Sequence, residues 1–282
     1  ATKESCFMCE GRWRTRTPTY GTDIVPDGRL RRGEVVLFPN LYPLAAFHAV
    51  VMLGERHFRL LNNIPASLLE DALTVSIEYF TTRRRHNPSI RYVTINANFL
   101  LPSGASAMHP HLQLLGSPFA GDHHQLLLEK RLDYYQASGS CYWTDLLEEE
   151  EARGERWITR TEERAWLTAY SPVGVHEVNA IWRNRSHFLE WGPVEIREMA
   201  DGIARVLHGS HDMKFSTYNF SCFSGPVDDR PTPEFRCLLR LVNRQNAILH
   251  HRTDDYFFQK LLKNEIIIQR PERLAAFLRG YF

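Results

Sequence analysis

The feature that most constrains the fold of this chain is an arrangement of predicted strands and helices that occurs twice in its 282 residues. In each round, two short apolar segments precede a long amphipathic helix, and two further strand-like segments follow it. The helices are predicted from Pro65 to about Arg85 and from Pro193 to His208, and the strands at residues 34–39, 48–53, 91–98, 165–170, 177–182, 216–223 and 235–242, with one more beginning near His109. This repetition predicts an α+β fold built from a duplicated unit, with two mainly antiparallel sheets and packed helices.

The two rounds divide the chain into an N-terminal unit of residues 1–160 and a C-terminal unit of residues 161–282. The boundary lies between Glu150 and Ala165, where the sequence has no low-complexity linker, so we expect the two units to pack closely. Hydrophobic residues make up 43% of the chain, which is enough for a substantial core.

Charge and composition exclude several classes of function. The formal net charge of +1 argues against a broad surface for long nucleic acid, so an anionic ligand would need a local site. No apolar run approaches the roughly 18 residues that cross a bilayer, and the N-terminus lacks the pattern of a signal peptide. The five cysteines are odd in number and sparse, which argues against a disulfide framework. We therefore expect a cytoplasmic protein with no membrane partner.

The segment His109-Pro-His111-Leu-Gln113 carries the clearest chemical signal. Side chains on a strand alternate between its two faces, so His109, His111 and Gln113 share one face. Pro110 cannot donate a ladder hydrogen bond, which favours a strand start or an edge strand. A neutral imidazole is a nucleophile near pH 7, and a second imidazole in the same row is suited to bind a metal. The alternative interpretation is that both histidines are structural.

Residues just upstream of this segment are suited to hold a phosphate. Asn98 offers an amide and Ser106 a hydroxyl, and the small residues around Gly104 would let a phosphate approach the backbone N–H groups. A second histidine pair, His123-His124, is predicted to lie in a solvated loop.

The pair Cys6-Phe-Met-Cys9 has the spacing of two zinc thiolates. Tetrahedral zinc needs two further ligands, and the chain has no second pair of this kind, so histidines would have to supply them. A thioredoxin-like redox site is disfavoured because no strand precedes the pair and no helical pattern follows it. Two incidental buried cysteines remain the alternative.

Together these segments resemble galactose-1-phosphate uridylyltransferase and its relatives, the transferase branch of the histidine-triad superfamily. The resemblance covers nearly the whole chain in order, and it rests most on the His-Pro-His-x-Gln segment with the preceding Gly-x-Ser. The supporting segments are residues 6–11, 36–43, 49–57 and 270–279, together with Asn98.

Carried over to this sequence, the resemblance implies zinc bound by Cys6, Cys9, His57 and His109, with His48 as the rival to His57. It implies that His111 is the nucleophile that attacks an α-phosphorus. The remaining implied contacts are to phosphoryl oxygens, from Gln113, Ser106, Asn98 and the turn at Gly104, and to the nucleotide, from Phe7 and Asn40. The zinc would act as a structural pin for the strand that carries His111.

The C-terminal half departs from the family pattern. In the family a late strand carries a His-x-His pair that belongs to a second metal site, whereas this chain has Arg236 and Leu238 there. We therefore predict that the second metal site is degenerate and absent. Arg236 and Arg240 alternate along the predicted strand and are candidates to bind an anionic acceptor. The alternative is that they are rim residues paired with Glu234 or Asp255.

The resemblance implies a nucleotidyltransferase or phosphorylase that acts on a nucleoside diphosphate sugar or a related activated nucleotide, with a covalent nucleotidyl-imidazole on His111. A dinucleoside polyphosphate phosphorylase and a repurposed hydrolase are alternatives within this class. A catalytically silent nucleotide-binding or zinc-stabilised module is the alternative of another class. The family resemblance also implies a homodimer.

Overall fold

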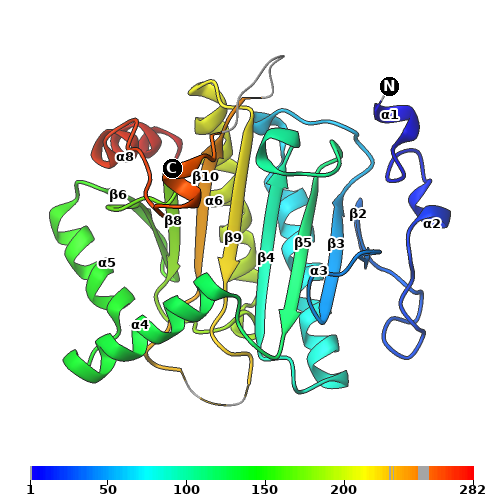
Figure 1. Cartoon of the computed structure of the whole chain (residues 1–282), viewed down its shortest axis with the longest axis horizontal. Coiled ribbons are helices and arrows are strands. Elements are labelled where there is room, and N and C mark those ends of the chain that lie inside the picture. Colours follow the sequence, from blue (N-terminus) through cyan, green and yellow to red (C-terminus); the bar gives the residue numbers. More distant parts are fainter. Residues whose placement is uncertain (1, 229, 231, 247–253) are drawn as a thin grey trace.

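The strands of the protein form one continuous antiparallel sheet. The structure, a computed structural model, describes residues 2–228, 230, 232–246 and 254–282. The sheet has ten strands in the order β1-β2-β3-β5-β4-β9-β10-β8-β7-β6 (Figure 1). In chain order the strands are β1 (Leu30–Arg32), β2 (Val35–Pro39), β3 (Phe47–Leu53), β4 (Tyr92–Phe99), β5 (His111–Ser117), β6 (Trp157–Arg160), β7 (Arg164–Thr168), β8 (Val175–Trp182), β9 (Thr217–Phe223) and β10 (Leu238–Arg244).

Helices cover both faces of this sheet. They are α1 (Thr2–Ser5), α2 (Trp13–Arg16), α3 (Ala66–His86), α4 (Asp122–Ser138), α5 (Tyr142–Arg153), α6 (Pro193–Asp212), α7 (Phe257–Lys260) and α8 (Pro271–Leu278), with short 3₁₀ turns η1 (Leu61–Asn63), η2 (Leu101–Ser103), η3 (Phe188–Glu190) and η4 (Arg279–Tyr281). The two long helices α3 and α6 pack against each other and lie behind the sheet in Figure 1. No helix in the described part of the chain is both long and apolar enough to span a bilayer.

The prediction of two sheets is wrong, because β4 and β9 join the two halves edge to edge. Their register runs from Thr94 opposite Phe223 to Phe99 opposite Tyr218, and the Phe99 and Tyr218 rings stack with centroids 5.1 Å apart. Pairing of these edges satisfies backbone groups that two separate sheets would each leave exposed.

The strand order is the same when it is followed inward from either outer edge. It runs 1-2-3-5-4 from one side and 6-7-8-10-9 from the other, and α3 and α6 occupy corresponding places in the chain. This symmetry agrees with the repeated pattern in the sequence. The duplication itself and the division at residue 160 remain predictions. β6 ends at Arg160 and pairs with β7, so the sheet places it beside the C-terminal strands.

The main hydrophobic core lies between the sheet and the helices α3, α6 and α8. Every second residue of β4 points into it, including Val93, Ile95 and Ala97, and residues of both halves contribute. At Gly202 of α6 a side chain has no room, because an added Cβ would lie 2.2 Å from the buried Trp166 ring. This glycine lets α6 approach β7 closely.

On the opposite face of the sheet, apolar side chains cover the N-terminal and the C-terminal strands, and the strands between them carry polar side chains. On the N-terminal side Met8 and Trp13 pack over apolar residues of β2 and β3. On the C-terminal side Leu128 of α4 and Trp143 of α5 pack over β7, β8 and β10. Between these two covers lies a row of half-buried polar side chains from three neighbouring strands, Gln113, Asn96 and Ser221.

Two strands begin later than the sequence pattern predicts. β5 begins at His111, since Pro110 has no N–H for the ladder. β10 begins at Leu238, because the N–H of Cys237 bonds to the carbonyl of Arg185 beyond the end of β8. Arg236 therefore precedes the strand that it was predicted to share with Arg240.

The doublet His123-His124 is the clearest error of local prediction. Both residues lie in the first turn of α4 rather than in a loop. His124 is buried and donates from Nε2 to the carbonyl oxygen of Ser224 at 2.7 Å, with its ring between Tyr92, Phe223 and Phe235. Tertiary packing overrides the polar character that favours a solvated position for this residue.

Candidate functional site

Two cysteines and two histidines from three parts of the chain converge on one point. Cys6 and Cys9 come from the N-terminal segment, His57 follows β3, and His109 precedes β5. Their ligand atoms all lie within 4.8 Å of one another. Nδ1 of His109 is 3.4 Å from Cys9 Sγ and 3.6 Å from Cys6 Sγ, and Nδ1 of His57 is 3.2 Å from Cys9 Sγ. These are the four predicted metal ligands, and His57 rather than His48 completes the set.

The donor chemistry of this cluster fits a zinc ion. Zinc bonds of about 2.0 Å to nitrogen and 2.3 Å to sulfur give roughly 3.5 Å between the ligand atoms of a tetrahedron, in agreement with the distances here. Nε2 of His109 donates to the carbonyl oxygen of Gly54 at 2.7 Å, which leaves Nδ1 with a lone pair facing the thiols. Burial and the neighbouring Cys6 raise the pKa of Cys9 to about 11, so a nearby cation would be needed to favour the thiolate.

His111 lies directly beside this cluster at the start of β5. Its side chain is buried, and its Nδ1–H donates to the carbonyl oxygen of His109 at 2.8 Å. A carbonyl oxygen only accepts, so the hydrogen is on Nδ1 and Nε2 carries the lone pair. Burial lowers the pKa of His111, which favours this neutral form. Among the residues that the structure describes, none hydrogen-bonds to Nε2.

Gln113 is the next residue on the same face of β5, and His48 of β3 holds its amide. His48 Nε2 lies 2.9 Å from Oε1 of Gln113, and the backbone N–H of Leu44 donates to His48 Nδ1 at 3.0 Å. Asn40, at the end of β2, places its amide nitrogen 3.1 Å from His48 Nε2. Burial lowers the pKa of His48, so its ring is neutral near pH 7.

Asn98 reaches the same place from β4. The register that pairs Ala97 with Leu112 puts Asn98 beside His111. Its Oδ1 accepts a hydrogen bond of 2.6 Å from Nδ2 of Asn219 on β9. Asn98 is therefore positioned by a residue of the C-terminal half.

The loop after β4 brings the predicted phosphate-binding turn toward the row. Leu100 is buried with φ at 69°, a strained value for a residue with a side chain, and Gly104 has φ at 88°. Ser106 follows in an exposed position, three residues before His109. The carbonyl of Ser103 accepts a hydrogen bond of 2.9 Å from Nδ2 of Asn219, which fixes this loop to the sheet.

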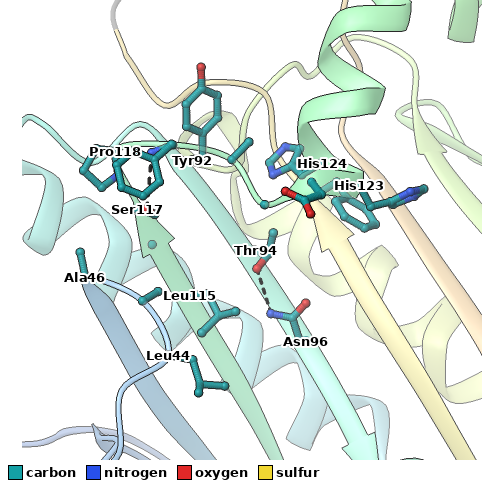
Figure 2. Close-up of a pocket in the computed structure, with 17 residues that line it drawn as sticks. Leu44, Ala46, Tyr92, Thr94, Asn96, Leu115, Ser117, Pro118, His123 and His124 are labelled. Atoms are coloured by element: carbon teal, nitrogen blue, oxygen red, sulfur yellow. Dashed lines mark hydrogen bonds between the residues drawn. The ribbon is translucent and has the colours of Figure 1, made fainter. Parts of the chain in front are cut away.

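A pocket of about 700 Å³ lies on the same face of β4 and β5, beyond Gln113. Figure 2 shows Thr94, Asn96 and Leu115 on its floor, with the first turn of α4 at one side and the β2–β3 turn at the other. Leu115 is two residues after Gln113 on the same strand, so the pocket continues the face that carries the row. Its volume is in the range of small-molecule sites.

Comparisons with known proteins show which proteins this chain resembles in sequence and in fold. No protein-family model matches it. An uncharacterised protein of Archaeoglobus fulgidus is 31% identical over 257 residues, 90% of this chain and 75% of that protein. A galactose-1-phosphate uridylyltransferase of Streptomyces lividans is 30% identical over 159 residues, 54% of this chain. The matched stretch spans 44% of that enzyme, less than half of its length.

Solved structures share the fold over nearly all of the chain. A uridylyltransferase structure matches with a TM-score of 0.78 and 19% identity, over 89% of this chain and 85% of that one. An ADP-glucose phosphorylase from Arabidopsis thaliana with bound ADP-glucose also has a TM-score of 0.78, with 21% identity over 98% of this chain and 90% of that one. The chain thus resembles a galactose-1-phosphate uridylyltransferase in sequence over about half of its length, and it has the fold of uridylyltransferase and ADP-glucose phosphorylase.

The residues predicted for the site do not all lie at one place in the structure. The four candidate metal ligands lie together with His111, Gln113 and Asn98. Phe7 lies between Cys6 and Cys9 in the sequence and is 38% exposed, and its contact with a nucleotide remains a prediction. Arg236 lies apart, beyond β4 and β9, and donates to the carbonyl oxygens of Arg183, Pro233 and Phe235.

The sequence did not identify two residues that hydrogen-bond to the site amides, His48 and Asn219. His48 was considered only as a rival metal ligand, and Asn219 was not singled out. The sequence offered one indication for His48. It lies two residues before Val50 on β3, and Val50 pairs with Gln113 on β5. Asn219 carried no signal, because its contact with Asn98 depends on the pairing of β4 with β9.

Proposed function

We propose that this protein is a nucleotidyltransferase or phosphorylase that acts on a nucleoside diphosphate sugar or a related activated nucleotide. The observation that supports it most is the single lone pair of His111 Nε2. It lies between the amides of Gln113 and Asn98 at the start of β5, beside the cluster of candidate metal ligands. The sequence relative with this activity and the shared fold of an ADP-glucose phosphorylase support the same class.

In the first step, Nε2 of His111 attacks the α-phosphorus of the donor. A bond forms between nitrogen and phosphorus, and the bond from phosphorus to the bridging oxygen breaks. The leaving sugar phosphate keeps that electron pair. The imidazole keeps its hydrogen on Nδ1, where the His109 carbonyl supports the positive charge that the ring gains.

In the second step, an oxygen of inorganic phosphate or of a sugar phosphate attacks the same phosphorus. The phosphorus–nitrogen bond breaks, and its electron pair returns to Nε2 of His111. Negative charge on the phosphoryl oxygens rises in both transition states, so donors at those oxygens accelerate both steps. We assign this role to the amides of Gln113 and Asn98, to the hydroxyl of Ser106 and to the backbone at Gly104.

The cluster of candidate metal ligands has a structural role in this proposal and takes no part in the bond changes. A zinc ion bound by Cys6, Cys9, His57 and His109 would supply a rigid crosslink between the N-terminal segment and the start of β5. The same crosslink would hold Phe7 in place. We assign Phe7 and Asn40 to contacts with the nucleotide. The pocket beyond Gln113 offers room for a group of the size of a nucleoside or a sugar.

Intact mass after incubation with donor alone tests the proposal. The purified protein is mixed with uridine, adenosine, guanosine and cytidine diphosphate sugars and with dinucleoside polyphosphates, without acceptor, and then quenched. We expect an adduct of one nucleoside monophosphate that the His111→Ala variant lacks. The exposed His208 gives a matched control, and His208→Ala should form the adduct at the wild-type rate.

The mass of the adduct would name the base. Addition of inorganic phosphate or of sugar phosphates to the isolated adduct would then name the acceptor by the rate at which the adduct disappears. Tight binding of a panel member to folded, metal-loaded protein without any adduct would contradict the proposal and support a silent nucleotide-binding module.

A further inference from the structure

The side-chain amides of Gln113 and Asn98, which lie beside His111, can each adopt two orientations. A carboxamide has an NH₂ group at one end and an oxygen at the other, and a rotation of 180° exchanges them. Phosphoryl oxygens accept hydrogen bonds, so only the NH₂ end stabilises them, and the oxygen end repels them. The proposed function, on which this inference rests, therefore requires a fixed orientation of Gln113 and of Asn98.

The orientation of Gln113 follows from a partner that can only donate. The backbone N–H of Leu44 points at Nδ1 of His48 at 3.0 Å, so Nδ1 carries the lone pair and Nε2 carries the hydrogen. The amide nitrogen of Asn40 also lies 3.1 Å from Nε2, but both groups are then donors and no hydrogen bond joins them. That hydrogen is donated to Oε1 of Gln113 at 2.9 Å. The oxygen end of the amide is occupied, and its NH₂ end has no hydrogen-bond partner within the described ranges of the chain.

The orientation of Asn98 follows from a longer chain of contacts. Nδ2 of Asn219 faces the carbonyl oxygens of Ala97 and Ser103 at 3.3 and 2.9 Å, and carbonyls only accept. Oδ1 of Asn219 accepts from the guanidinium of Arg244 at 2.6 Å. The atom of Asn98 that faces the NH₂ group of Asn219 at 2.6 Å must therefore be its oxygen. The NH₂ end of Asn98 is left to donate.

Arg244 is itself held in place. Its Nε and Nη2 donate to the two carboxylate oxygens of Asp254 at 2.8 and 2.6 Å, a fork that allows one orientation of the guanidinium. The carboxylate of Asp254 thus determines, through Arg244 and Asn219, which end of Asn98 faces the nucleophile.

We propose that His48 and Asn219 are positioning residues that each bind the oxygen of an active-site amide, so that both amides present N–H groups to the phosphoryl oxygens. They act from opposite sides of the β5–β4 pair, one from β3 and one from β9. His48 acts through Gln113, and Asn219 acts through Asn98 and the loop at Ser103.

Two double-mutant cycles test this proposal. The first combines His48→Ala with Gln113→Ala, and the second combines Asn219→Asp with Asn98→Ala. Aspartate has the size of asparagine and still accepts from Arg244, but it cannot donate to Asn98. The readout is the single-turnover rate of adduct formation at saturating donor, with the donor Kd measured separately and folding checked by circular dichroism.

We expect each single variant to slow adduct formation by up to about 100- to 1,000-fold, the range for the loss of one transition-state donor. The donor Kd should change by only a few-fold, because the charge on the phosphoryl oxygens rises mainly in the transition state. Each cycle should be non-additive by about fivefold or more, since the positioning residue has less to orient once its amide is gone. Additive cycles, or equal effects on Kd and on rate, would overturn the proposal.

A second measurement tests the orientation of the two amides even if the protein forms no covalent adduct. Absence of any adduct in the wild-type protein would count against the covalent mechanism. The same cycles are then measured as the affinity for uridine and adenosine monophosphate, whose phosphate needs the same N–H donors. Weaker and non-additive binding supports the orientation of the amides, and additive or unchanged binding in folded variants overturns it.

Discussion

At the scale of single residues, His109 links the cluster of two cysteines and two histidines to His111. Its ring faces Cys6 and Cys9, and its backbone carbonyl accepts the Nδ1 hydrogen of His111. His109 thus fixes the ring of His111 relative to the cluster, and Nε2 of that ring is the atom that we expect to react. The neighbouring His48 has an equally defined place, but it faces Gln113 and is turned away from the metal ligands.

The two histidines should therefore differ in their effect on bound metal. His57→Ala removes one of four ligands, and we expect the bound zinc to fall well below about one ion per chain. His48→Ala should keep about one ion per chain, because its ring contacts no ligand. Elemental analysis of protein purified without added chelator measures both. Metal loss in His48→Ala with full occupancy in His57→Ala would contradict the assigned ligand set.

At the scale of elements, α4 is anchored to the sheet by one buried histidine in its first turn. Burial lowers the pKa of His124 to about 4, with Arg131 as a further contribution in the same direction. Its ordinary value of 6.5 applies in the unfolded chain. Protons therefore bind the unfolded state first as the pH falls below 6.5.

The sign of this pKa shift predicts a loss of stability in acid. The contribution of His124 is complete above pH 6.5 and decreases as the pH falls toward 4, by about 2 kcal/mol between pH 7 and pH 5. His124→Gln can still donate to Ser224 but does not titrate. Urea unfolding at both pH values should show a smaller pH dependence in this variant, and an unchanged dependence would refute the assignment.

The helix α6 packs on β7 through a contact that admits no side chain at Gly202. A methyl group there would overlap the buried Trp166 ring, so Gly202→Ala should lower the free energy of unfolding by about 1–3 kcal/mol despite the better helix propensity of alanine. Gly280→Ala is the control, because an added Cβ there meets no atom within 4 Å. Denaturant titration measures both, and equal stability of Gly202→Ala and wild type would show that the helix can shift.

At the scale of the whole molecule, the two halves of the chain share one sheet and one core. The main hydrophobic cluster contains residues of β2 to β5 and of β7 to β10, and the β4–β9 pair crosses the middle of the sheet. The site depends on this junction, because Asn219 and Arg244 reach Asn98 from the C-terminal half.

We therefore expect the protein to unfold in a single cooperative transition. Differential scanning calorimetry should give one peak whose calorimetric and van't Hoff enthalpies agree, since the main hydrophobic core contains residues of both halves. Two resolved peaks would indicate that the halves unfold independently, and they would favour the predicted division at residue 160 as a boundary between folding units.

The sequence by itself determined the elements and the ligand chemistry of this protein. Apolar periodicity predicted α3 and α6 and eight of the strands near their observed positions, because local patterns report which face is buried. The residue types Cys6, Cys9, His109 and His111 carry chemistry that few other residues supply. The sequence did not decide between His48 and His57 as the metal ligand, because His48 lies in β3 and His57 follows the same strand.

Only the tertiary structure decided how these parts meet. The joining of β4 to β9 turned two predicted sheets into one, and backbone edges carry no sequence signature that selects a partner. The same pairing placed Asn219 against Asn98, and the β3–β5 register placed His48 near Gln113. Hydrogen bonds between distant residues depend on register and orientation, which long-range packing sets and which local sequence does not encode.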